Sequence, residues 1–183
     1  MIDIDKEKFC ELFKEIKPEE IPDDVFTLVG KVFPVITAGK GGEFNSMTAS
    51  GGGMGLLFRK HSVWLVIQQG RLTLELMKKE QSWSLSYFPD EYKKQVFFLG
   101  SKSGRDSDKM KEVELTAIPT PAGNIAFKEA RLIIDCKLTQ VTSIYADDFC
   151  TKESKAYIDE VYKDPNELRQ YVFGEIVSVW VKK

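Results

Sequence analysis

The chain has 183 residues and a mass of 20.8 kDa, which suits one domain with a core of its own. Its composition is 43% hydrophobic and 30% charged, which excludes a disordered chain. Lys and Arg total 26 and Asp and Glu total 28, so the net charge of −2 gives no sign of a nucleic acid partner. We expect a single domain over residues 1–183, with a helical extension at about 1–30.

Targeting signals and metal motifs are absent from the sequence. The N-terminus is acidic and mixed, and no apolar run reaches the ~18 residues of a membrane helix, so we expect a cytoplasmic protein without a membrane partner. Cys10, Cys136 and Cys150 are odd in number and far apart, which favours reduced thiols. His61 is the only histidine; it cannot form a multi-histidine metal site and is expected in a loop or at a strand edge. If the protein is an enzyme, a borrowed cofactor carries the difficult chemistry.

The first half of the chain begins with apolar residues at helical spacing. Phe9, Leu12, Phe13 and Ile16 predict an amphipathic helix over residues 6–16. The elements expected next, in order, are a short helix at 25–31, strands at 32–38 and 63–69, a helix at 72–79 and a strand at 84–88.

The second half begins with a helix from Pro89 to Gly100. It continues with strand segments at 113–118 and 125–130, a strand at 131–141, a helix at 152–162 and a strand at 171–181. The 131–141 strand alternates, with Leu132, Ile134, Cys136 and Leu138 on one face and Arg131, Asp135, Lys137 and Thr139 on the other, which predicts a half-buried antiparallel strand. Six or seven strands with three or four short helices favour a closed antiparallel barrel decorated by helices over a parallel doubly wound sheet.

Small residues, hydroxyls and glycines crowd the segment 45–55, which we expect to be a loop. Glycines let backbone N–H groups approach a ligand closely, and Ser and Thr hydroxyls add donors. The residues alone leave a ligand loop and a flexible polar connection as equal alternatives.

The segment 69–73 lies where a strand ends and a helix begins. Thr73 is the expected N-cap, and Arg71 offers a planar donor fork suited to phosphate. Because helix N-termini favour anions, this is a candidate phosphate anchor. A capped helix with a solvated arginine remains the alternative.

A third polar segment, 100–109, again combines glycines and hydroxyls, now with mixed charge. It is either solvated surface or a ligand contact. Three segments match the sequence pattern of one known family, in the order in which that family has them. They are Asn-Ser-Met-Thr-Ala-Ser at 45–50, Ser103-Gly104-Arg105-Asp106-x-Asp108-Lys109, and Phe173-Gly174-Glu175-Ile176. On these residues the chain resembles the flavin reductase-like, FMN-binding split-barrel family, over about four-fifths of its length.

The resemblance implies a mainly β fold with short helices, namely a six-stranded antiparallel, Greek-key split barrel that forms a homodimer with FMN near the interface. It places the flavin and its ribityl phosphate against Asn45, Ser46, Met47, Thr48, Ala49 and Ser50. It assigns the phosphate to Arg71 and Thr73, and it brings Ser103, Gly104 and Lys109 to the cofactor from a neighbouring loop. The chain departs from relatives at Gly51, where they often have Trp, and at Arg169, where they often have His.

The function implied by the resemblance is an FMN-dependent oxidoreductase of the flavin reductase type. Hydride passes from NAD(P)H to the flavin and on to a small-molecule or protein acceptor, without a catalytic side chain. One alternative is a non-enzymatic FMN electron-transfer protein similar to flavoredoxin. Another is a split-barrel protein that binds a different ligand, such as haem or another flavin.

Overall fold

The structure is a computed structural model that describes residues 6–106, 108–162 and 169–183. The first half contains, in order, α1 (Lys6–Leu12), β1 (Phe13–Ile16), η1 (Pro18–Glu20), α2 (Val25–Thr27), η2 (Leu28–Val32), β2 (Val35–Lys40), β3 (Glu43–Thr48), β4 (Gly52–Leu57), β5 (Lys60–Gln68), α3 (Leu72–Glu80) and β6 (Ser82–Tyr87). The second half contains η3 (Asp90–Tyr92), α4 (Lys93–Ser101), α5 (Lys109–Glu112), β7 (Ala117–Pro119), β8 (Ile125–Phe127), β9 (Leu132–Ser143), η4 (Ala146–Asp148), α6 (Lys152–Val161) and β10 (Arg169–Lys182).

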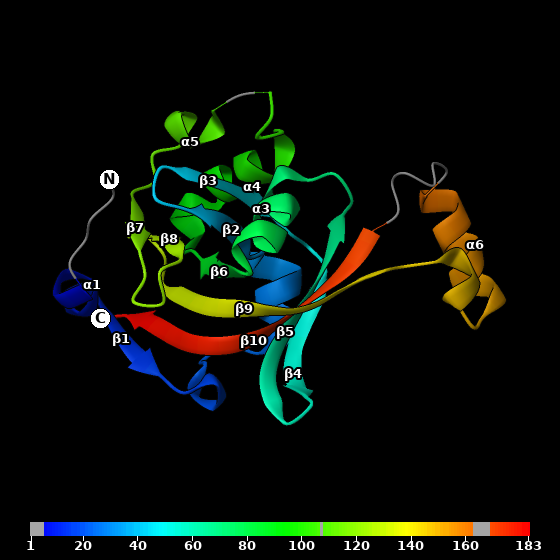
Figure 1. Cartoon of the computed structure of the whole chain (residues 1–183), viewed down its shortest axis with the longest axis horizontal. Helices are drawn as coiled ribbons and strands as arrows, with labels where there is room; N and C mark the ends of the chain where they lie inside the picture. The colour runs from blue at the N-terminus through cyan, green and yellow to red at the C-terminus, as the bar shows by residue number, and fades with distance from the viewer. Residues whose placement is uncertain (1–5, 107, 163–168) are drawn as a thin grey trace.

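The described residues form a mainly β, antiparallel fold with short helices, as expected. The main sheet has eight strands, seven of them in the order β3-β2-β6-β9-β10-β5-β4, and β1 pairs with β10 beside this path. Strands β7 and β8 form a separate pair. The main sheet thus has two strands more than the expected six, and β7 and β8 are additional to it. Figure 1 shows the strongly curved sheet around α3 and α4, with α6 standing apart at the far ends of β9 and β10.

Two apolar cores lie on opposite faces of β9. One contains Ile134 and Cys136 with Trp83, and the other contains Ile133 with Phe127. The prediction of a half-buried strand at 131–141 is therefore wrong for its first half. Asp135, expected to face solvent, is fully buried.

The buried carboxylate of Asp135 is surrounded by hydrogen-bond donors. Its Oδ1 accepts from Thr120 and Asn124, both at 2.8 Å, and its Oδ2 accepts from Ser178 at 2.9 Å and Trp180 at 3.3 Å. Burial raises the pKa of Asp135, while these hydrogen bonds act in the opposite direction. The network fixes the turn between β7 and β8 against β9 and β10.

The N-terminal helix expected at 6–16 is only half as long. Helix α1 ends at Leu12, and Phe13–Ile16 extend as β1 along residues 179–182 of β10. Pairing of β1 with β10 satisfies the backbone and lets Phe9 and Phe13 bury against Trp180, which overrides the helical spacing.

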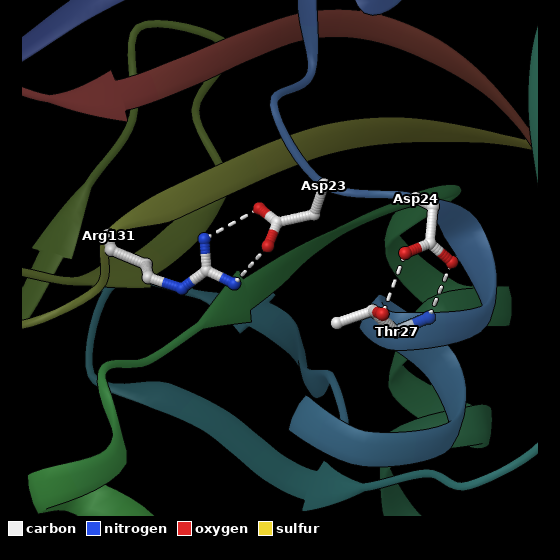
Figure 2. A network of polar contacts seen from close by, with 4 residues as sticks. All are labelled: Asp23, Asp24, Thr27 and Arg131. Carbon is white, nitrogen blue, oxygen red and sulfur yellow. Dashed lines mark hydrogen bonds and ion pairs between the residues drawn. The ribbon is translucent and has the colours of Figure 1, made fainter.

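The next segment of the N-terminal region is pinned to the barrel by polar contacts. Figure 2 shows Arg131 donating both Nη atoms to the carboxylate of Asp23, at 2.6 and 2.9 Å. The adjacent Asp24 caps α2 by accepting from the backbone N–H and the hydroxyl of Thr27, at 2.9 and 2.7 Å. The short helix expected at 25–31 is thus confirmed as α2 and the π-helical turn η2.

The glycine-rich segment 45–55 is not a loop, because most of it lies in β3 and β4. The cross-strand partner of Gly53 is Trp64, and a Cβ at Gly53 would lie 2.4 Å from the Trp64 ring. The indole therefore covers the surface that a side chain on β4 would otherwise occupy. This cross-strand packing stabilises β4 as a strand, although its glycines have low strand propensity.

Candidate functional site

A cavity of about 330 Å³ opens where the ends of β3, β5 and α4 meet the start of α3. Strand β3 contributes Asn45, Met47 and Thr48. The connection from β5 to α3 contributes residues 68–73, and the segment after α4 contributes Ser103, Gly104 and Lys109. The fold thus brings together eight predicted site residues: Asn45, Met47, Thr48, Arg71, Thr73, Ser103, Gly104 and Lys109.

The cavity is positively charged. Arg71, Lys102 and Lys109 line it, and no Asp or Glu among the described residues does so. Lys102 pairs with Glu112 at 2.8 Å, whereas the Arg71 guanidinium, within the described ranges, donates only to the neutral Gln68 side chain, also at 2.8 Å. The electrostatics of this lining favour an anionic ligand.

Helix α3 directs its N-terminus at the same cavity. Its N-cap position is occupied by Arg71, with no side-chain cap on the first turn. The expectation that Thr73 is the N-cap is wrong, because the helix begins at Leu72 and Thr73 lies inside its first turn. The uncapped N–H groups and the helix dipole add to the attraction of the cavity for an anion.

Thr73 instead forms part of the floor of the cavity. Its buried hydroxyl accepts a hydrogen bond of 2.7 Å from Nδ2 of Asn45. Gly104 packs on the other side of Asn45, where a Cβ would lie 2.1 Å from Asn45 Oδ1. Glycine at 104 is thus required by a close approach between the loop and β3.

Lys109 is almost fully buried, with 2% of its surface exposed. Its Nζ donates to the carbonyl oxygens of Leu99 at 2.8 Å and Lys102 at 2.9 Å, which places a cation at the C-terminal end of α4. Burial, followed by repulsion from Arg71, lowers the pKa of Lys109 to about 8. A bound anion would relieve this repulsion and raise the pKa.

The other three predicted site residues lie around the cavity without lining it. Ser46 is fully buried, backbone included, and its hydroxyl is 2.8 Å from that of Thr37, so it presents no surface to a ligand. Ala49 and Ser50 line a neighbouring cavity of about 340 Å³.

This neighbouring cavity is aromatic, and the sequence predictions missed its character. Phe33 and Phe97 line it, with their ring centroids 5.7 Å apart. It shares Thr48 and Gly100 with the cationic cavity. The helical spacing that buries Val96 and Leu99 leaves Phe97 facing outward, and this signal was available in the sequence.

Metal chemistry finds no support in the part of the chain that the structure describes. No group of three or more His, Cys, Asp or Glu residues is placed to hold a metal ion within it. His61 lies at the start of β5, and its Nε2 is 2.9 Å from a carboxylate oxygen of Glu19. No helix in the described ranges is long and apolar enough to cross a membrane.

The family model for the flavin reductase like domain matches residues 28–183. The chain belongs to this flavin reductase-like family. The match leaves α1, β1, η1 and α2 outside the family domain. The helical extension at about 1–30 stays a prediction, and part of this region is the strand β1, which pairs with β10.

Solved structures share the split-barrel fold with this family member. The FMN-binding protein of Thermus thermophilus with bound 1-cyclohex-2-enone is 21% identical, with a TM-score of 0.63 over 92% of this chain and 78% of that chain. The FMN-binding domain of a flavin reductases-like enzyme from Shewanella baltica is 13% identical, with a TM-score of 0.65 over 92% and 76%. The flavoredoxin of Methanosarcina acetivorans is 17% identical, with a TM-score of 0.61 over 93% and 76%. No curated protein sequence matches the chain.

Neither Gly51 nor Arg169, the two positions at which the chain departs from the expected pattern, lines the cationic cavity. Gly51 precedes β4, and its carbonyl accepts from the N–H of Val66 at 3.1 Å. Arg169 opens β10 as the cross-strand partner of Gln68, and its guanidinium lies 5.4 Å from the ring centre of Tyr162. Of these residues, only Gln68 lines the cavity.

Proposed function

We propose that the chain binds FMN and acts as an NAD(P)H-dependent oxidoreductase of the flavin reductase type. The main support for this proposal is a pair of adjoining cavities. Among the described residues, one cavity is lined by cations and by no carboxylate, and the other is lined by aromatic rings. FMN has the same division between a phosphate and an apolar ring system. The volumes of both cavities are typical of small-molecule sites.

The phosphate fits the cationic cavity. Arg71 offers its donor fork, Lys109 a buried ammonium, and α3 its first-turn N–H groups. Asn45, Thr73 and Gly104 shape the floor beneath it. The flavin ring fits against Ala49 and Ser50, beside the contacting rings of Phe33 and Phe97.

The bound flavin supplies the redox chemistry, accepting hydride from the nicotinamide and passing electrons to an acceptor. The protein positions it and balances its charge. Among the described residues, no Asp, Glu, His, Cys or Lys lines the aromatic cavity, and nothing there activates the hydroxyls of Thr48, Ser50 and Ser101, so we assign no catalytic side chain. Thr48 connects the two cavities, and its hydroxyl donates to the carbonyl of Val96.

Anaerobic mixing of the FMN-loaded protein with NADH or NADPH tests the reductase activity. We expect bleaching of the flavin absorbance within seconds. Tight FMN binding without bleaching at millimolar nicotinamide would reject the reductase and leave a flavoredoxin-like electron-transfer protein. A purified protein that neither contains nor takes up flavin would reject both.

We also propose a homodimer with FMN near the interface. The exposed apolar side chains Phe26, Leu56 and Phe58 support an association surface, since each has at least 72% of its area exposed. Light scattering should give twice the chain mass of 20.8 kDa. A mass equal to one chain would exclude an interfacial site.

A further inference from the structure

A hydrogen bond joins the two ends of the turn between β5 and α3. Gln68 is the last residue of β5, and Arg71 is the N-cap residue of α3. Between them, Gly70 has a φ of +74°, a conformation that glycine adopts without strain and that turns the chain from strand to helix. The turn brings both residues into the lining of the cationic cavity, where Nη2 of Arg71 donates to Oε1 of Gln68 at 2.8 Å.

The chemistry of the two groups decides which way the Gln68 amide points. A guanidinium has donors and no acceptor, so the amide atom that faces Arg71 is the oxygen. A second cation, Arg169, lies opposite Gln68 in the ladder between β5 and β10. Its guanidinium, however, lies 5.4 Å from the ring centre of Tyr162. Within the described part of the chain, Arg71 is therefore the cation that the Gln68 oxygen holds.

This contact restrains Arg71 and leaves its charge in place. The ion pair of Arg131 with Asp23 shows the alternative, because there a carboxylate both holds and neutralises the guanidinium. The Gln68 amide accepts a hydrogen bond but carries no charge. No Asp or Glu of the described ranges lines the cavity, so the full positive charge of Arg71 acts on an anion that enters it.

Holding the guanidinium in advance lowers the entropic cost of binding. Arg71 is exposed, and a free arginine side chain loses many rotamers when it grips a phosphate. The backbone of Arg71 is already fixed, since its carbonyl accepts from the N–H of Glu75 at 3.2 Å. The bond to Gln68 orders the far end of the side chain as well. Ordering one such side chain before the ligand arrives is worth about 3- to 10-fold in affinity.

We propose that Gln68 is a positioning residue of the phosphate site, which holds the Arg71 guanidinium in the cationic cavity without neutralising it. The inference rests on the proposed flavin site, because that site assigns the FMN phosphate to Arg71. It adds that the affinity for the phosphate depends on an uncharged acceptor at position 68.

Replacing Gln68 with methionine tests the proposal, because methionine has a similar length and no strong acceptor. Titration of the flavin-stripped full chain, followed by flavin fluorescence, should show FMN weakened by about 3- to 10-fold. Riboflavin, which has no phosphate, should change by less than about twofold, which also shows that the variant folds. The matched control is Gln140→Met, at an exposed position of β9 that lines neither flavin cavity, and it should change neither Kd.

A double-mutant cycle separates positioning from a general effect on the fold. In the Arg71→Ala chain, Gln68→Met should change the Kd of FMN by less than about twofold, because no guanidinium is left to hold. The same loss in both backgrounds would overturn the proposal while leaving the FMN site intact. Equal weakening of FMN and riboflavin by Gln68→Met would overturn it too.

The variant Gln68→Glu tests the requirement for an uncharged acceptor. It keeps an oxygen for Arg71 and adds a negative charge beside the phosphate, so it should weaken FMN more than Gln68→Met does. An FMN affinity equal to that of the wild type would refute the requirement.

A measurement without flavin separates this proposal from the flavin site itself. Inorganic phosphate should raise the thermal midpoint of the wild-type chain relative to chloride at equal ionic strength, and should raise that of Gln68→Met less. A wild-type chain that binds no flavin but shows this difference would reject the flavin site and uphold the role of Gln68. Equal midpoint shifts in the two chains, or none in either, would overturn that role.

Discussion

Replacing Arg71 with alanine should weaken FMN binding by about 10- to 30-fold and leave riboflavin binding nearly unchanged. Arg71 lies at the N-cap of α3, and among the described residues its guanidinium donates only to the neutral Gln68 side chain, so the variant breaks no ion pair there. A hydrogen bond to a charged group contributes roughly 1.5–3 kcal/mol. Arg71 is exposed, so solvent screening favours the lower part of this range, about 1.5–2 kcal/mol. At about 1.4 kcal/mol per tenfold change, this gives the expected factor.

The measurement is the quenching of flavin fluorescence on titration with protein, for FMN and riboflavin in parallel. Arg71→Lys keeps the charge without the planar fork and should fall between the wild type and Arg71→Ala. Lys152→Ala removes an exposed cation at the start of α6, which contributes nothing to the cavity, and should change neither Kd. Equal weakening of FMN and riboflavin by Arg71→Ala would refute the assignment, because riboflavin has no phosphate.

Two further outcomes follow from the packing and the charges. Gly174→Ala should lower the free energy of unfolding by about 1–3 kcal/mol, because a Cβ there would lie 2.2 Å from the buried Trp83 ring. Urea denaturation measures this loss. The control Gly55→Ala should be almost neutral, because its Cβ would lie 3.6 Å from the nearest atom, in the Trp64 ring. The affinity for FMN relative to riboflavin should be constant from pH 7 to about 8 and fall above it, because the pKa of Lys109 is about 8 in the free chain and the phosphate binds its protonated form. Lys109→Met should abolish this pH dependence, and a profile that persists in the variant would contradict the role of Lys109.

Local sequence patterns predicted the elements whose partners lie close in the chain. Helix α6 begins and ends within one residue of the expected 152–162, because its spacing and the Thr151 cap lie within one segment. The sequence singles out the β3 residues and Arg71 by their chemistry. Small residues let a ligand approach the backbone, hydroxyls offer donors, and a guanidinium after a strand suits a phosphate. Asn45, Met47, Thr48 and Arg71 line one cavity, and their contact with a flavin stays a prediction.

Long-range partners decided the features that the sequence did not reveal. The sequence pattern predicts Thr73 as the N-cap because it does not fix the first residue of the helix to within one position. The hydrogen-bond partner of Thr73 in the structure is Asn45, which is 28 residues away in the chain. The buried position of Asp135 depends on donors from two distant segments, the turn between β7 and β8 and strand β10, so strand alternation alone placed it in solvent. The role of Phe33 in a cavity required knowledge of where α4 packs.

The pairing of β1 with β10 has a consequence for biosynthesis. Phe13 lies opposite Lys182, so this ladder joins residues separated by nearly the whole described chain. Strand β1 can pair with β10 only after β10 has been synthesised. Until then Phe9 and Phe13 lack the Trp180 ring that covers them. The newly made chain therefore carries an exposed aromatic pair throughout its synthesis, which makes this segment a natural place for a chaperone to bind.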